Sequence, residues 1–159
     1  MDLPPDIVAK EALRRVTWTL RRADLAVQAA KEPGLRSVGV PAAHYALLMH
    51  VHTYPGLTGA ELARHLGVTT QAVALLATKL EARGLLERRT HPRHRNVHEL
   101  HLTDAGLDAL RAADSVITEV ERRVCHALGP ERCDQLRGLL DEVIGHLAQG
   151  AAAEGYQPL

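Results

Sequence analysis

The stretch from Thr58 to Leu102 decides the fold, and it reads TGAELARHLGVTTQAVALLATKLEARGLLERRTHPRHRNVHELHL. Its first part predicts a short helix, because Thr58 is a good N-cap and Glu61, three residues later, can complete a capping box. Gly67 is typical of the residue that closes such a helix, since glycine adopts the left-handed backbone without steric cost. The stretch therefore opens with a helix that ends in a tight turn.

A second helix is predicted directly after this turn. Thr69 is its N-cap, apolar residues recur at helical spacing as far as about Arg83, and Gly84 closes it. The segments Leu85–Thr90 and Asn96–Leu102 then predict the two strands of a hairpin, because polar and apolar residues alternate in the second segment. Helix, turn, helix and hairpin in this order are typical of a winged helix-turn-helix, whose second helix lies in the major groove of DNA.

The second helix must bury one face and expose the other. The residues expected to face inward are Val73, Leu76, Ala77 and Leu80. Those expected to face solvent or DNA are Thr69, Thr70, Gln71, Ala74, Thr78 and Lys79. Thr70 and Gln71 lie in the first turn, so we expect them to contact base edges, which differ between all base pairs in the major groove.

The hairpin has a local excess of positive charge in a chain whose formal net charge is zero. Between Arg83 and Arg95 there are five arginines and one acid, Glu87, so the local charge is +4. Such a patch can neutralise phosphates, which contribute much of the affinity of a protein for DNA. We therefore expect Arg89, Arg93 and Arg95 to contact the DNA backbone or the minor groove. A solvated structural hairpin is the alternative that pattern and charge alone leave open.

Three segments carry a family resemblance: the first helix with its turn, Leu57–Thr69; the end of the second helix, Leu80–Arg89; and the close of the hairpin, Leu100–Gly106, which has the pattern LxLTxxG. They resemble the MarR (multiple antibiotic resistance regulator) family, and the likeness extends over nearly the whole chain. The resemblance implies a winged-helix homodimer that binds a pseudo-palindromic promoter site, usually as a repressor. It also implies release from DNA when a small ligand or an oxidant acts.

The tip of the hairpin departs from the family's usual Asp-Pro-x-Asp-Arg-Arg. Pro92 and Arg95 match, but His91 and His94 replace the two acids and Asn96 replaces the last arginine. The usual bracing between acid and arginine inside the wing is therefore in doubt. The loss of two negative charges should, in turn, favour contact with phosphates.

Helices with apolar stripes are predicted on both sides of the central stretch. The first runs from after Pro5 to about Ala30 and is expected to stop at Pro33-Gly34. We predict one mainly α domain with a small β-hairpin wing. Its parts are expected to be dimerisation helices at 1–34 and 104–149, a winged helix-turn-helix lobe at 42–103 and a tail at 150–159, with helices at about 42–54, 104–128 and 131–148.

Two groups of residues are candidates for receiving a signal. The resemblance implies an effector cavity between the first, second and fifth helices, and its candidate lining residues are Trp18, His44, Tyr45 and His52. The simpler alternative makes Trp18 part of an interface and leaves the histidines exposed. Cys125 and Cys133 lie on either side of the Gly129-Pro130 break and could face each other, so they are a candidate redox pair. Small buried cysteines are the common alternative.

The remaining features limit the function classes. Two cysteines make no disulfide framework, no stretch approaches the roughly 20 apolar residues of a membrane span, and the first residues lack a signal peptide. We therefore expect a reduced, cytoplasmic protein. Because no phosphate loop, nucleophile elbow or zinc-hydrolase motif is present in the sequence, we expect no enzyme, no cofactor and no metal.

The expected partners are double-stranded DNA, a second copy of the chain and a small-molecule effector, with no membrane contact. The alternative function is a winged-helix protein-interaction module without DNA binding. The two hypotheses differ in one measurable property, because only the first predicts DNA affinity that falls steeply with salt.

Overall fold

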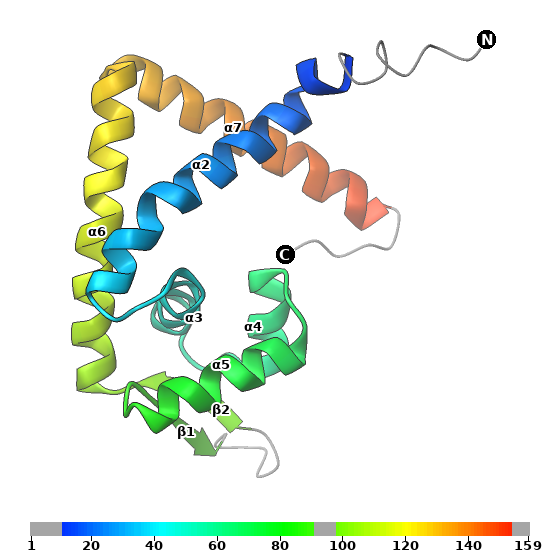
Figure 1. Ribbon diagram of the computed structural model, residues 1–159. Coiled ribbons are helices and arrows are strands. Elements are labelled where there is room, and N and C mark those ends of the chain that lie inside the picture. The colour runs from blue at the N-terminus through cyan, green and yellow to red at the C-terminus, as the bar shows by residue number, and fades with distance from the viewer. Residues whose placement is uncertain (1–10, 91–97, 154–159) are drawn as a thin grey trace.

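The computed structural model describes residues 11–90 and 98–153. Helical residues 11–14 lead into the first long helix. The elements in chain order are α2 (Val16–Ser37), α3 (Ala42–Thr53), α4 (Gly59–Leu66), α5 (Thr70–Ala82), β1 (Leu86–Thr90), β2 (His98–Leu102), α6 (Asp104–Leu128) and α7 (Pro130–Ala153). The predicted fold class, mainly helical with one β-hairpin, is confirmed. Figure 1 shows a winged lobe of α3, α4, α5 and the hairpin, framed by the long helices α2, α6 and α7.

The core of the winged lobe is made almost entirely of aliphatic side chains. Its fully buried members come from the end of α2, from α3, α4 and α5, and from the segment before α3; they are Leu35, Val40, Leu47, Leu48, Leu62, Val73 and Leu80. Burying one such side chain contributes about 2 kcal/mol relative to leaving it exposed. The core therefore holds α4 and α5 firmly against α3, so that the outer face of α5 is presented on a rigid support.

The two short helices begin and end at the predicted residues. The Thr58 hydroxyl oxygen accepts the Glu61 backbone N–H at 3.3 Å, and the Glu61 carboxylate accepts the Thr58 backbone N–H at 2.8 Å. These bonds form the predicted capping box of α4. Gly67 ends that helix with φ 64°, and the Thr69 hydroxyl oxygen caps α5 by accepting the Ala72 N–H at 3.1 Å. The turn between the helices is thus fixed by local chemistry.

The capping box gives the lobe an acid-sensitive element. The hydrogen bonds from Thr58 lower the pKa of Glu61 below its ordinary value of 4.5. A group with a lowered folded pKa stabilises the fold above its unfolded pKa, and this stabilisation is lost as the pH falls through the folded value. We expect Glu61→Gln to cost about 1 kcal/mol at neutral pH, the usual scale of a helix cap, and nothing below the folded pKa. Urea unfolding at neutral pH and at a pH below the folded pKa of Glu61 measures the free energy lost, and the exposed Glu11→Gln is the control. An equal loss at the two pH values would contradict the prediction.

The hairpin pairs in antiparallel register from Leu86↔Leu102 to Thr90↔His98. Its strands begin and end within a residue or two of the prediction where the structure describes them. The predicted tip, residues 91–97, lies outside the described residues. Thr58 forms an isolated bridge with Glu99, so the loop before α4 adds a third, very short segment beside β2. This bridge connects the hairpin directly to the helix-turn-helix.

The first long helix contradicts the prediction that Pro33-Gly34 would stop it. α2 continues through both residues to Ser37. A Cβ at Gly34 would lie 2.5 Å from a Val116 methyl carbon, so the missing side chain lets α2 approach α6 closely. Leu35, one residue on, is completely buried in the core of the lobe. Tertiary packing therefore outweighs the local cost of a proline inside the helix.

The last two helices meet at a sharp elbow. Gly129, with φ 81°, ends α6, and Pro130 is the first residue of α7, a position that suits a residue without an N–H. The tail predicted from Gly150 is wrong at its start, because α7 continues to Ala153. In the described parts of the chain, no helix combines the length and the apolar character needed to cross a membrane.

Candidate nucleic-acid interface

The outer face of α5 is the centre of the candidate interface. All six residues predicted to face solvent or DNA are exposed, and they are Thr69, Thr70, Gln71, Ala74, Thr78 and Lys79. On the opposite side, Val73, Ala77 and Leu80 are at most 1% exposed. The amphipathic pattern of the sequence therefore places the polar face correctly, while the role of each residue in binding stays a prediction.

Local hydrogen bonds divide these six residues into engaged and free groups. Thr69 is occupied as the N-cap of α5, and the Thr78 hydroxyl donates to the Ala74 carbonyl oxygen at 2.9 Å. Thr70 and Gln71 occupy the first turn of α5, whose residues contact base edges in helix-turn-helix complexes. The geometry therefore favours Thr70 and Gln71 as the residues that read sequence.

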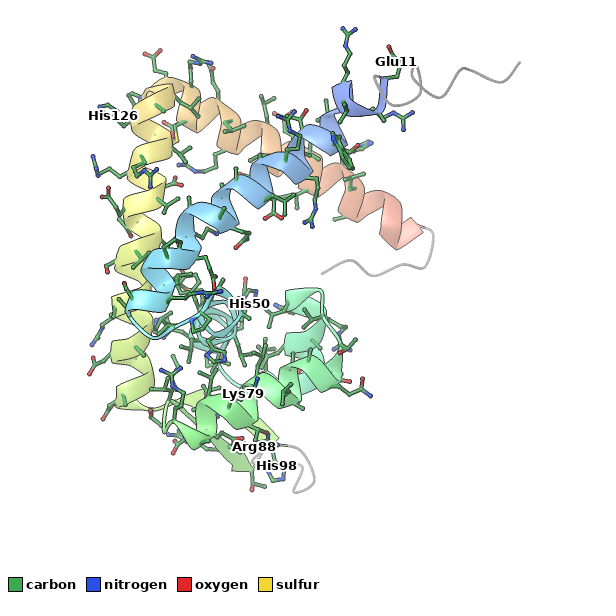
Figure 2. All side chains as sticks on the ribbon, in the orientation of Figure 1. Glu11, His50, Lys79, Arg88, His98 and His126 are labelled. Atoms are coloured by element: carbon green, nitrogen blue, oxygen red, sulfur yellow. A yellow bond between two sulfur atoms is a disulfide. The ribbon has the colours of Figure 1, made fainter. Side chains whose placement is uncertain are left out.

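The wing strands lie beside this face. A hollow of about 220 Å³ separates α5 from the hairpin, and it is lined by Thr70 and Ala74 from the helix and by Arg88 and His98 from the strands. Figure 2 shows Lys79, Arg88 and His98 at the same end of the molecule. The residues predicted from sequence did not include Arg88 and His98. The period of two in each strand could have found them, since Arg88 and His98 lie on one face of the hairpin in the observed register.

The described arginines near the hairpin are less free than the sequence suggested. Arg88 Nε donates to both carboxylate oxygens of Glu81, at 2.9 and 3.1 Å, and Arg89 Nε donates to Glu87 at 2.7 Å. These ion pairs are exposed, so each stabilises by only a few tenths of a kcal/mol to about 1 kcal/mol and can open when a phosphate competes. Arg93 and Arg95 belong to the tip outside the described residues, as do His91 and His94, and their expected contacts with DNA stay predictions.

The four candidate effector residues do not gather at one place. Trp18 is 47% exposed on α2, and His52 is exposed near the end of α3. His44 Nδ1 lies 3.4 Å from an Arg83 guanidinium nitrogen, and partial burial together with nearby Arg83 and Lys79 lowers the pKa of His44. The imidazole therefore stays neutral at neutral pH and can accept this hydrogen bond. The expectation of one shared cavity is corrected by this arrangement.

Only Tyr45, of those four residues, lines the cleft between α2 and α3. The cleft has a volume of about 370 Å³, and its other lining residues are Gln28, Lys31, Leu35, Ala42, Ala43, Ala46, Met49 and His50. The Tyr45 hydroxyl donates to an Asp114 carboxylate oxygen at 3.1 Å, and burial together with this bond raises the pKa of Tyr45 to about 12. Gln28 and Lys31 were missed because the first helix was predicted to end near Ala30, before it reached α3, whereas α2 continues to Ser37.

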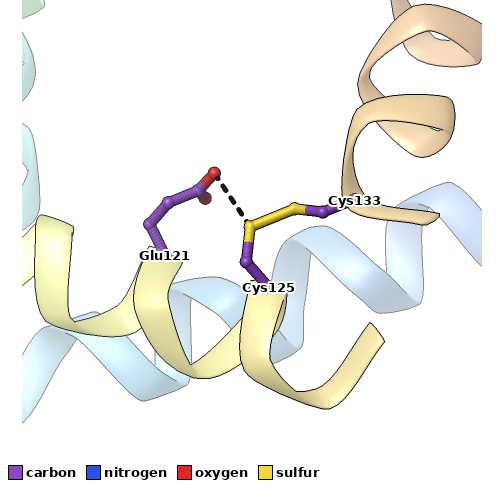
Figure 3. A group of neighbouring side chains, drawn as sticks. All are labelled: Glu121, Cys125 and Cys133. Atoms are coloured by element: carbon purple, nitrogen blue, oxygen red, sulfur yellow. Dashed lines mark hydrogen bonds between the residues drawn. A yellow bond between two sulfur atoms is a disulfide. The ribbon is translucent and has the colours of Figure 1, made fainter. Parts of the chain in front are cut away.

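Cys125 and Cys133 face each other across the elbow between α6 and α7, as their spacing suggested. They are joined in a disulfide, with their Cα atoms 5.3 Å apart (Figure 3). The expectation of reduced thiols is therefore wrong for this structure. It was based on the lack of a disulfide framework, but two cysteines eight residues apart can form a single disulfide without one. A Glu121 carboxylate oxygen lies 3.6 Å from the Cys125 sulfur. These three residues could hold a metal ion only after reduction, because disulfide sulfurs are not thiolate ligands.

The sequence profile of the MarR family matches residues 38–95, which contain α3, α4, α5 and β1. An uncharacterized protein of Mycobacterium bovis is 35% identical over 97 residues, which cover 61% of this chain and 68% of that protein. The chain belongs to the MarR family. The transcriptional regulatory protein proposed for the hcr operon of Thauera aromatica is 28% identical over 102 residues, which cover 64% of this chain and 61% of that protein.

Solved structures extend the likeness beyond the winged lobe. The transcriptional repressor CouR bound to a 23-mer DNA duplex is 27% identical, with a TM-score of 0.76, over 91% of this chain and 99% of that chain. CouR bound to p-coumaroyl-CoA is 26% identical, with a TM-score of 0.72, over 90% of this chain and 98% of that chain. The likeness therefore includes α2, α6 and α7, and this MarR-family chain is a transcription regulator.

Proposed function

We propose that this MarR-family protein binds duplex DNA as a homodimer, and that it represses transcription from a pseudo-palindromic promoter site until a small effector releases it. The exposed first turn of α5, with Thr70 and Gln71 beside the wing strands, carries the proposal. Residues 42–103 form the DNA-binding lobe, and the helices at both ends of the chain form the dimerisation arms. The similarity to DNA-bound CouR supports this assignment.

The dimer is supported by apolar side chains that one protomer leaves uncovered. They lie in helical residues 11–14, at the start of α2 and along α7, and each is between 38% and 69% exposed. They are Leu13, Val16, Trp18, Leu136, Leu139, Val143, Ile144 and Leu147. The two groups meet at a cleft of about 960 Å³, lined from both helices. So large an apolar surface in one region marks an interaction site. In a helix-turn-helix dimer the two recognition helices enter successive major grooves about 34 Å apart, so we expect this spacing between the two α5 helices.

The cleft between α2 and α3 is the proposed effector site. Its volume of about 370 Å³ suits a small molecule, and Leu35 and Met49 supply apolar walls. Lys31 gives the cleft a positive group, so the effector would have an apolar body and an anionic group. The similarity to CouR bound to p-coumaroyl-CoA supports a ligand of this general kind. The protein would act in the cytoplasm, where bacterial DNA lies, and would catalyse no reaction.

Fluorescence anisotropy with labelled DNA from upstream of the protein's own gene, beside scrambled DNA, tests the proposal. The wild-type dimer should discriminate between the two DNAs and should lose affinity steeply as salt rises. Gln71→Ala should lower specific affinity about tenfold, because a good side-chain contact with a base edge contributes about 1–3 kcal/mol of discrimination. Its salt dependence should stay unchanged, since no phosphate contact is removed.

Gln135→Ala is the matched control for DNA contact, because Gln135 is an exposed glutamine on α7 and lies outside the DNA-binding lobe. It should bind both DNAs as the wild type does. If Gln71→Ala binds specific DNA as tightly as this control, α5 does not read sequence through its first turn. If a folded wild-type dimer binds neither DNA, the alternative function, a winged helix used for protein contacts, becomes the better explanation.

A further inference from the structure

The disulfide at the elbow is placed where it controls the position of α7. Cys125 lies in the last turn of α6 and Cys133 in the first turn of α7, with only Gly129 between the two helices. Among the α7 side chains whose burial the structure describes, residues 130–148, Cys133 is the only buried one, at 6% exposure. Within one protomer, the described side chains of α7 are therefore buried only at the elbow, where the disulfide joins α7 to α6.

The other end of α6 is fixed to the winged lobe. The Thr103 hydroxyl donates to the Gly84 carbonyl oxygen at 2.6 Å and accepts the Gly106 N–H at 3.0 Å. Gly84 lies between α5 and β1, so these bonds connect α6 to the end of the proposed recognition helix. A change in the angle between α6 and α7 is thus transmitted along a continuous helix of 25 residues to the DNA-binding lobe.

We propose that Cys125 and Cys133 form a reversible thiol–disulfide site, which reacts with low-molecular-weight thiols and disulfides, and that the disulfide fixes α7 in the orientation that favours DNA binding. Its effect on DNA rests on the function proposed above, because α7 carries much of the apolar dimer surface. With the bond in place, the two recognition helices are held at one spacing. Fixing a binding geometry in advance raises affinity by lowering the entropy lost on binding.

The two sulfurs have different roles in the exchange reaction. Cys125 is half-buried and Cys133 almost fully buried, so an incoming thiolate reaches the Cys125 sulfur first. Attack forms a mixed disulfide on Cys125 and releases Cys133 as a thiolate, which takes up a proton. A second thiol then attacks the mixed disulfide, so that two small thiols are oxidised to one small disulfide and two protein thiols are formed. Oxidation by a small disulfide is the reverse of these two steps.

Glu121 lies beside the Cys125 sulfur, and Arg137 contacts Glu121. In the reduced protein the Cys125 thiol can donate a hydrogen bond to Glu121, 3.6 Å away, which the disulfide cannot do because its sulfur has no proton. An Arg137 guanidinium nitrogen lies 3.4 Å from the same carboxylate oxygen. Glu121 is thus engaged by a cation, and the cluster offers three ligands where structural zinc uses four. These contacts favour thiol–disulfide exchange over metal binding.

A regulatory role fits the bond better than a purely structural one. The cysteines are only eight residues apart, and so short a ring restricts the unfolded chain less than a long-range bridge does. A protein that binds DNA also works in a reducing compartment, where disulfides are usually transient and redox-sensing.

Redox titration tests the chemistry without reference to DNA. The full-length protein is equilibrated in glutathione buffers that range from fully reduced to fully oxidised, then trapped with a maleimide, and its free thiols are counted by mass. We expect the number of free thiols per chain to change from two to zero within this range of buffers. A protein that stays disulfide-bonded throughout, or one that never forms the bond, would overturn the proposal.

A second pair of measurements tests the consequence. On reduction, amide hydrogen exchange along α7 should become about tenfold faster and specific DNA affinity should fall about tenfold, within the usual range of coupling between sites. The Cys125→Ser/Cys133→Ser double variant should match the reduced wild type in every buffer. Cys133→Ser alone should form a mixed disulfide on Cys125 without slowing exchange in α7, which separates bridging from simple thiol modification.

These readouts separate the two proposals. If neither redox form binds DNA but exchange in α7 still follows the redox state, the proposed function fails and the thiol–disulfide site stands. If DNA binding is sequence-specific but the oxidised and reduced forms bind equally, the proposed function stands and the link between the elbow and DNA is refuted. If hydrogen exchange in α7 is also the same in both forms, the disulfide does not fix α7 at all.

Discussion

A Leu139→Asp/Val143→Asp variant should be a folded monomer whose specific DNA affinity has fallen at least a hundredfold. Both side chains line the cleft between α7 and the start of α2, and in one protomer they are 59% and 38% exposed. In the proposed dimer the substitutions would bury four unpaired carboxylates, each at a cost of several kcal/mol. Every 1.4 kcal/mol lost is about a factor of ten in affinity, so the dimer would dissociate at working concentrations.

Loss of the dimer removes the second half-site contact, and the remaining recognition helix binds with the affinity of a single module. The winged lobe should nevertheless stay folded, because its buried core lies in other elements. Sedimentation velocity measures the association state, circular dichroism the helix content and anisotropy the DNA affinity. Asp141→Asn is the matched control, because it changes one charge on another face of the same helix and should leave the dimer intact. A double variant that remains a tight dimer would place the interface elsewhere.

Local chemistry made the centre of this fold predictable from sequence. The capping box of Thr58 and Glu61, the left-handed Gly67 and the Thr69 cap each depend on residues within one turn of the chain. Pro33-Gly34 misled the prediction for the opposite reason. The glycine signals a turn in the sequence, yet in the fold it serves a close approach to Val116, which is more than eighty residues away. A contact of this kind leaves no mark in the local pattern.

In the candidate interface, too, features set by local sequence were predicted and features set by contacts between elements were missed. Amphipathic spacing was enough to identify the outer face of α5, because the face follows from the period of the helix. Counting arginines overstated the available positive charge, since Glu81 and Glu87 lie where they pair with Arg88 and Arg89. The effector cleft was missed for a third reason. Its lining comes from two helices whose relative position depends on the unexpected continuation of α2.

The family pattern LxLTxxG ends in a glycine for a reason that the structure makes explicit, and Gly106→Ala should therefore be severely destabilising. A Cβ at Gly106 would lie 1.9 Å from the Leu85 carbonyl oxygen and 2.9 Å from its carbon. Both are backbone atoms at the start of the hairpin, so no side chain can rotate away to make room. The same Leu85 oxygen accepts the Thr103 N–H at 3.2 Å, and a shift would break this bond as well.

We expect Gly106→Ala to lower the free energy of unfolding by about 3 kcal/mol or more, the upper range for inserting atoms into a packed core. Gly138→Ala is the matched control, because Gly138 is also inside a helix but has open space where a Cβ would lie. There alanine should be neutral or stabilise by up to about 1 kcal/mol, since it favours helix more than glycine does. Urea unfolding of both variants gives the comparison. If they are equally stable, α6 does not pack on the Leu85 backbone, and the link from the elbow to the recognition helix fails with it.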